Sequence, residues 1–266
     1  MQIRAGSDNI MAQPEIHQFP CLKDNFGVLV HDPEGGVTLA IDAPDAAAVK
    51  SALEAQGWTL THILVTHHHA DHTAGIPDLK AATECTVVGP RAEAGRIPGL
   101  DREVAEGDVL ELGTLRISVL DTPGHTLGHV SYWIEDAKVA FVGDTLFAMG
   151  CGRVLEGTAE MMWGSLQKIA ALPPDTSLYC GHEYTVANGR FGLSVEPDNA
   201  ALKTRLEEAE ALRAKGQPTL PTRVDLELAT NVFLRAHEKS LREHVNMLVV
   251  PDWKVFAELR ERKNRA

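Results

Sequence analysis

Four histidines lie close together in the stretch THHHADHTAG, residues 66–75. The residues before it, ILVT, are typical of a strand, and neighbouring side chains of an extended chain point in opposite directions. His67 and His69 can therefore face one metal ion, while His68 faces the other way. The pattern HxHxDH directly after an apolar strand thus predicts a metal site.

The next two donors, Asp71 and His72, are expected at the start of a helical segment that directs them toward a second metal ion. Taken alone, Asp71 could be a helix N-cap. Three later donors each follow an apolar strand and lie in a glycine-flanked loop: His125 in SVLDTPGHTLGH, Asp144 in VAFVGDTLF and His182 in SLYCGHEY. Singly, these could be turn or buried loop residues, but their shared position at strand ends favours ligation.

Asp144 is the natural shared ligand, because a carboxylate has two oxygens and can bridge two cations. A catalytic zinc takes about three protein ligands plus water, and the donors divide accordingly. One metal ion is assigned His67, His69, His125 and Asp144. The other is assigned Asp71, His72, His182 and Asp144. Such sets suit zinc, iron and manganese, so we expect two divalent ions, zinc first and iron or manganese as alternatives.

The chemistry expected of such a site is hydrolysis. Two metal ions lower the pKa of a water between them to about 7, which makes hydroxide available at neutral pH. Asp71 is expected to orient this nucleophile as well as to bind a metal ion. The chain has no GxSxG serine motif. The remaining histidine near the site, His129, is expected to support the ligands rather than to be one.

Composition narrows the class of protein. The 266 residues are 44% hydrophobic, which suffices for a sizeable core, and the formal net charge of -12 argues against binding to nucleic acid or to anionic membranes. The four cysteines form no CxxC motif, and no signal peptide or membrane span is visible. We expect a cytoplasmic monomer with reduced thiols and a polar leader over residues 1–13.

Short β-branched runs and intervening helices fill the first two-thirds of the chain, which predicts an α/β class with two sheets. A helix is expected over 45–57, with Asp45 as N-cap and Gly57 as C-cap, and a second helix over 157–172.

After about residue 183 the sequence pattern changes from short strand-like runs to helical ones. Helices are predicted over 197–216, 231–245 and 251–265, with a linker at QPTLPT. A catalytic domain over residues 14–183 would then be followed by a helical domain over 184–266.

With these residues the chain resembles the metallo-β-lactamase superfamily, of which THxHxDH is the defining motif. Within it, the chain is similar to glyoxalase II, the hydroxyacylglutathione hydrolases, through GCGRVLEGTAEMM (150–162), YCGHEYT, EPDNAAL (196–202), TNVFLR (230–235) and FAELRERK (256–263). The resemblance implies a four-layer αββα sandwich with a C-terminal helical domain. It also implies hydrolysis of S-D-lactoylglutathione to D-lactate and glutathione, as in methylglyoxal detoxification.

The family's glutathione contacts correspond to Arg153, Tyr184, Arg260 and Lys263 of this sequence. Arg260 and Lys263 share a face of the last predicted helix, although a solvated helix end would also favour such cations. The chain departs from the family pattern at Leu155, where tyrosine is usual, and this removes one hydrogen bond worth about 1 kcal/mol. Phe26 likewise stands where tyrosine is frequent.

Several rival functions share the motif. A persulfide dioxygenase-like enzyme would use a single iron, but its chain would stop soon after the sandwich. A β-lactamase would carry a secretion signal, and a nuclease would want a basic surface. Another thioesterase or hydrolase of this fold is also an alternative. A metal-binding protein without activity is a further one, but the presence of all seven ligand positions argues against it.

Overall fold

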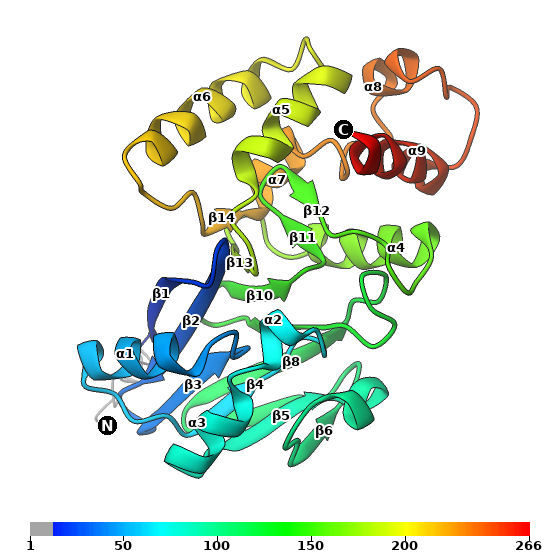
Figure 1. Cartoon of the computed structure of the whole chain (residues 1–266). Coiled ribbons are helices and arrows are strands. Elements are labelled where there is room, and N and C mark those ends of the chain that lie inside the picture. Colours follow the sequence, from blue (N-terminus) through cyan, green and yellow to red (C-terminus); the bar gives the residue numbers. More distant parts are fainter. Residues whose placement is uncertain (1–12) are drawn as a thin grey trace, which may run out of the picture.

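The computed structural model describes residues 13–266, so the leader expected over 1–13 lies outside the described residues except for Gln13. Two mixed six-stranded sheets face each other, with helices on both outer sides (Figure 1). This is the αββα sandwich expected from the sequence.

The first sheet has the order β1-β2-β3-β4-β5-β6. Its strands β1, β2 and β3 pair antiparallel, and β3 to β6 pair parallel. The strands are β1 (Glu15–Cys21), β2 (Asn25–Asp32), β3 (Val37–Ile41), β4 (His62–Leu64), β5 (Thr86–Pro90) and β6 (Arg102–Val104).

The second sheet has the order β14-β13-β10-β9-β8-β7, and only β10 and β13 pair in parallel. A short hairpin of β11 (Leu146–Phe147) and β12 (Gly150–Cys151) follows β10. The sheet strands are β7 (Val109–Leu112), β8 (Leu115–Asp121), β9 (Val130–Ile134), β10 (Val139–Gly143), β13 (Ser177–Cys180) and β14 (Thr222–Arg223).

Central strands are buried on both faces, which explains their nearly continuous apolar sequences. In β2, Val28 and Val30 pack between the two sheets, whereas Leu29 points to the outer side. The same alternation separates Leu64 from Ile63 in β4. The side-chain period of two thus builds two separate cores from one strand.

Helices form the outer layers. α1 (Ala46–Gln56) and α3 (Ile76–Thr83) pack on the first sheet, and α4 (Ala159–Ala170) packs on the second. As expected, Asp45 caps α1 by accepting from Ala48 N, and Gly57 ends it in the left-handed region. The remaining elements before β13 are short: α2 (Ala70–Thr73) and the 3-10 helix η1 (Arg91–Arg96).

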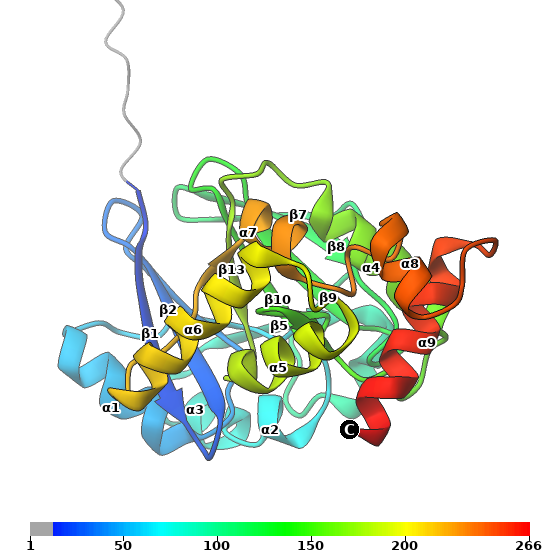
Figure 2. The same cartoon turned by 90° about the horizontal axis from the view of Figure 1, so that it is seen from above.

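The C-terminal helices lie over the second sheet, above β10 and β13 in Figure 1, and Figure 2 shows them from above. They are α5 (Thr185–Val195), α6 (Ala200–Ala214), α7 (Val224–Thr230), α8 (Lys239–His244) and α9 (Asp252–Arg265). The sequence reasoning missed α3, α5 and α7. It placed the start of α6 too early, since Asn199 is its N-cap.

The single helix predicted over 231–245 is wrong. Only α8 is helical there, and turns occupy the residues before it. The side chain of Asn231 accepts a hydrogen bond from Phe233 N and donates to the carbonyls of Phe147 and Gly150. A side chain that bonds the backbone in this way competes with helix formation.

Among residues 13–266, no helix combines the length and the apolar character needed to cross a lipid bilayer.

Candidate active site

The ends of strands from both sheets bring the predicted donors together. His67 and His69 lie in the loop after β4, and α2 then presents Asp71 and His72. The donors from the second sheet come from the loop between β8 and β9, from the residue directly after β10, and from the loop after β13. They are, in that order, His125, Asp144 and His182.

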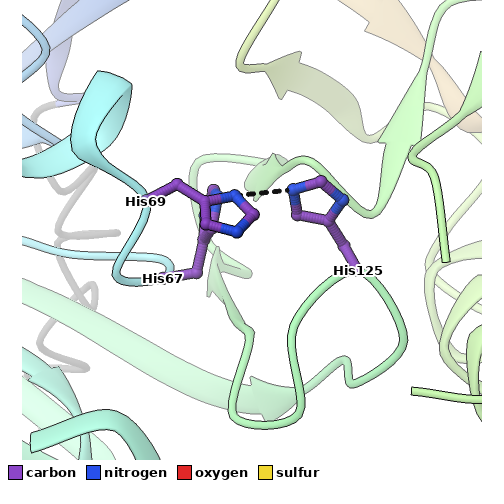
Figure 3. Close-up of side chains that lie close together, drawn as sticks. All are labelled: His67, His69 and His125. Carbon is purple, nitrogen blue, oxygen red and sulfur yellow. Dashed lines mark hydrogen bonds between the residues drawn. The ribbon is translucent and has the colours of Figure 1, made fainter. Parts of the chain in front are cut away.

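Three imidazoles form the first group of donors. His69 Nδ1 lies 3.1 Å from His67 Nε2 and 3.0 Å from His125 Nε2. Figure 3 shows the three rings facing one another from two separate loops. These three nitrogens lie close enough together to bind one metal ion.

The second group combines two imidazoles with a carboxylate. His182 Nε2 lies 3.4 Å from Asp71 Oδ2, and His72 Nε2 lies 3.8 Å from the same oxygen. These donors, too, are close enough to share one ion. His67, His72 and Asp144 form a further set of donors close enough to share an ion, so the two groups adjoin each other.

Asp144 lies between the two groups. Its Oδ1 is 3.3 Å from His72 Nε2, and its Oδ2 is 3.4 Å from both His125 Nε2 and His182 Nε2. The carboxylate thus presents an oxygen to a histidine of each group. This is the position that a bridging ligand needs.

The far ring nitrogens of four donors are held by fixed partners, as is usual for metal-binding histidines. His67 Nδ1 contacts Thr66 Oγ1 at 2.9 Å, and His125 Nδ1 donates to the Arg153 carbonyl at 2.9 Å. His72 Nδ1 lies 2.8 Å from Asp42 Oδ2, and His182 Nδ1 lies 3.0 Å from Asp24 Oδ1.

Sequence reasoning missed Asp42 and Asp24. Asp42 is buried, and besides holding His72 it accepts from both the backbone N–H and the hydroxyl of Thr66. Its sequence signal was the same as that of the ligands: it directly follows strand β3. Asp24 precedes β2 and had no comparable signal.

Burial and charge set the protonation of the donors. Burial and the neighbouring His72 and His129 hold the pKa of His67 well below its ordinary value, so its imidazole is neutral. Burial lowers the pKa of His182 by itself, but Asp144 and Asp71 outweigh this effect and raise it to about 10. His72 and His182 in turn hold the pKa values of the Asp144 and Asp71 carboxyls below the usual range, so both carboxyls are ionised.

The residues fit a metal site. His72 Nε2 and Asp144 Oδ1 are buried and lack a hydrogen-bond partner. Leaving such atoms unpaired in the interior is costly, and a cation between them would satisfy both. Imidazole and carboxylate donors of this kind suit divalent transition metals.

A cleft of about 600 Å³ opens beside the donors. The four residues expected to contact glutathione all line it: Arg153, Tyr184, Arg260 and Lys263.

Two of the five basic residues of α9, Arg260 and Lys263, contact other parts of the fold. Arg260 is only 7% exposed. Its guanidinium donates to the Cys151 carbonyl and lies over the Phe233 ring. Lys263 Nζ donates to the Ala187 carbonyl at 2.9 Å. Burial and the neighbouring Arg260 lower the pKa of Lys263.

The other histidines and thiols near the site are not among its donors. His68 faces away from His67 and His69, as expected, and contacts Glu93. His129 is fully buried and accepts from the backbone N–H of Asp144. Cys151 and Cys180 are buried free thiols.

Two family models match the chain: the metallo-beta-lactamase superfamily over residues 28–182 and the hydroxyacylglutathione hydrolase C-terminus over residues 183–266. A hydroxyacylglutathione hydrolase of Rhodopseudomonas palustris is 56% identical over 252 residues, which cover 95% of this chain and 99% of that one. One of Brucella ovis is 53% identical over 250 residues, covering 94% and 97%.

Solved structures show the same fold. The crystal structure of ETHE1 from Myxococcus xanthus superposes with a TM-score of 0.64 at 27% identity, covering 95% of this chain and 98% of that one.

Proposed function

The chain belongs to the hydroxyacylglutathione hydrolases of the metallo-β-lactamase superfamily, and on this premise we propose that it hydrolyses S-(2-hydroxyacyl)glutathione thioesters. The expected substrate is S-D-lactoylglutathione, and the products are D-lactate and glutathione. One observation carries the proposal: five of the seven metal-type donors and all four predicted glutathione contacts line a single cleft.

We assign two divalent metal ions, zinc first, to the donors of this cleft. The first ion is assigned to His67, His69, His125 and Asp144, and the second to Asp71, His72, His182 and Asp144. The unpaired buried atoms of His72 and Asp144 support this assignment. When bound, the ions would supply Lewis acidity for the thioester carbonyl and make hydroxide available near neutral pH.

The basic residues of the cleft are proposed to hold the glutathione part of the substrate. Glutathione carries two carboxylates and one ammonium group, so its site needs several cations. Arg153, Arg260 and Lys263 supply them from two sides of the cleft, from the loop after β12 and from α9. Tyr184 adds a hydroxyl beside them.

Asp71 is proposed to orient the attacking water. Its carboxylate is half-exposed in the cleft, and the hydrogen bond from His182 is the main reason that its pKa lies below the usual range. It is therefore ionised at neutral pH and accepts a hydrogen bond from water. Asn25 Nδ2 fixes the orientation of Asp71 by donating to its carbonyl and to Oδ2.

No general acid is assigned to the leaving group. A thiol has a pKa of about 8.5, so the glutathione thiolate departs with little help from a proton donor. The buried thiol of Cys151 takes no part, because burial raises its pKa to about 11.

The division of labour along the chain is also a proposal. Residues 14–183 would hold the metal ions and contribute Arg153, and residues 184–266 would form the helical substrate-binding domain. The boundary between the two family matches supports this division. We propose that the enzyme acts as a monomer, without nucleic acid or membrane.

The deciding experiment is a steady-state assay with S-D-lactoylglutathione, in which the released thiol is measured. Zinc-loaded protein should turn over, chelator-treated protein should not, and zinc should restore the rate. Absence of turnover by protein that holds two metal ions would refute the proposal. A single bound iron with oxygen uptake would favour the persulfide dioxygenase-like alternative.

A further inference from the structure

A buried carboxylate outside the cleft has no part in the mechanism above. Glu93, in η1, is only 3% exposed. Its Oε2 accepts from both the backbone N–H and Nδ1 of His68, each at 2.7 Å. Its Oε1 accepts from the backbone N–H of Gly128 at 3.0 Å. Burying a carboxylate is costly unless its oxygens are satisfied, and here three donors satisfy them.

The two partners of Glu93 lie in the two loops that carry the first group of donors. His68 stands between His67 and His69, and Gly128 lies in the same loop as His125. Glu93 therefore joins the two loops whose imidazoles must meet at one point.

Gly128 is required for this contact. A Cβ atom there would lie 2.5 Å from Glu93 Cγ and 2.8 Å from Ala92 Cβ. Any side chain at this position would push the loop of His125 away from Glu93.

Glu156 reinforces the same junction. Its Oε2 accepts from the Leu127 N–H at 3.1 Å, and its Oε1 accepts from Arg96 at 2.7 Å. Because Glu156 also lies 3.6 Å from His68 Nε2, these side chains could bind a cation themselves. The guanidinium of Arg96 already pairs with Glu156, and both Glu93 oxygens accept hydrogen bonds from the two loops, so a positioning role fits better than a third metal site.

The second group of donors has anchors of its own outside this junction, besides the hydrogen bond from His72 N to the His69 carbonyl. His72 is held by Asp42, and His182 is held by Asp24. A change at Glu93 should therefore act on one metal ion and spare the other.

We propose that Glu93 is a positioning residue that fixes the His67–His69 loop against the His125 loop, and that it thereby sets the affinity of the first metal ion selectively. This inference rests on the dinuclear site of the proposed function. Glu93 touches neither substrate nor metal, so it acts only through the geometry of the three imidazoles.

The test compares stepwise metal affinities. Glu93→Gln keeps the size and shape of the side chain but replaces one carboxylate oxygen with an NH2 group. That NH2 group must face an N–H donor of His68 or Gly128, so one hydrogen bond is lost. Removing such an outer partner typically weakens a metal site 10–100-fold. Competition between a chelator and the cobalt-loaded protein should show one ion weakened by that factor and the other unchanged.

Two further variants separate positioning from general damage. Gly128→Ala keeps the carboxylate but displaces the loop, and it should give the same selective loss. Glu103→Gln neutralises an exposed carboxylate on β6 and should bind both ions as the wild type does. If Glu93→Gln does not fold, Glu93→Asp and Gly128→Ala provide the same comparison.

Proton NMR of cobalt-substituted protein identifies which ion is lost. When the Glu93→Gln variant holds a single cobalt ion, the spectrum should contain cobalt-shifted signals from two imidazoles, those of His72 and His182. In one-metal Asp24→Asn, which weakens the other site, it should show signals from three.

Each outcome has one meaning. Equal weakening of both ions, or two ions held as in the wild type, overturns the inference. A third metal ion in the wild type that is missing in Glu93→Gln also overturns it, in favour of a cation site. Wild-type protein that never binds two ions refutes the proposed function instead.

Discussion

His72 Nε2 and Asp144 Oδ1 lie 3.3 Å apart in the interior, and neither atom has a hydrogen-bond partner. The fold brings them together from α2, which follows β4 of the first sheet, and from the end of β10 in the second sheet. A cation placed between these two atoms would complete the contacts of both. A metal ion is the group that suits imidazole and carboxylate together.

The first prediction concerns Asp144, the donor shared by the two groups. Asp144→Ala should remove both metal ions and lower kcat by at least a thousandfold, because each ion loses a ligand and the charge between the ions disappears. Elemental analysis of purified protein is the measurement. Asp175→Ala removes an exposed carboxylate paired with Lys138 and serves as the control. Two metal ions retained by Asp144→Ala would contradict the bridging role.

The second prediction concerns protons released on metal binding. Without metal, His182 has a pKa of about 10, and Asp144 and Asp42 raise that of His72 despite its burial. Both imidazoles are then protonated at neutral pH, and both must lose their protons to bind a metal ion. Loading should release about two protons per chain near pH 7. Calorimetry in buffers of different ionisation enthalpy counts them, and a release of none would contradict the assignment.

The same pKa shift predicts the stability of the metal-free protein. The folded-state pKa of His182 lies above its ordinary value of 6.5, so its stabilising contribution is fully present below pH 6.5. That contribution is lost as the pH rises through about 10. The melting temperature of metal-free protein should therefore fall between these values. The melting temperature of metal-free His182→Gln should fall less over the same pH range. An equal fall would mean that a group other than His182 causes the pH dependence.

The ligands could be predicted from the sequence for a simple physical reason. Each follows a recognisable strand, and alternation of side chains in an extended chain separates His68 from His67 and His69. Asp42 has the same signal, because it directly follows β3, but nothing in the local sequence pairs it with His72, and Asp24 has no such signal. Asp42 is 30 residues from His72, and Asp24 is 158 residues from His182. Only the folded sandwich pairs them.

Helix boundaries in the tail show the same limit. The amide of Asn231 bonds the carbonyls of Phe147 and Gly150, which are 84 and 81 residues away. Those contacts hold the chain in turns where its local sequence favours a helix. Local propensity therefore predicted α9 and most of α6 but failed just before α8.

The fourth prediction concerns Arg260. Arg260→Ala should raise KM for the glutathione thioester about tenfold with a smaller change in kcat. The reason is that a cation that binds the remote part of the substrate stabilises the bound substrate and the transition state equally. Arg262→Ala removes a cation of the same helix that pairs with Glu258 outside the cleft, and it should leave KM unchanged. Equal KM values for the two variants would make Arg260 a structural residue only.

The last prediction uses the departure at Leu155, whose side chain is 56% exposed where the family pattern has tyrosine. Leu155→Tyr should restore one hydrogen bond to glutathione, worth about 1 kcal/mol, and lower KM about fivefold. Leu155→Phe supplies the same ring without the hydroxyl and should leave KM near that of the wild type. If both variants lower KM equally, the gain comes from apolar contact, and the missing hydroxyl does not limit the affinity of this enzyme.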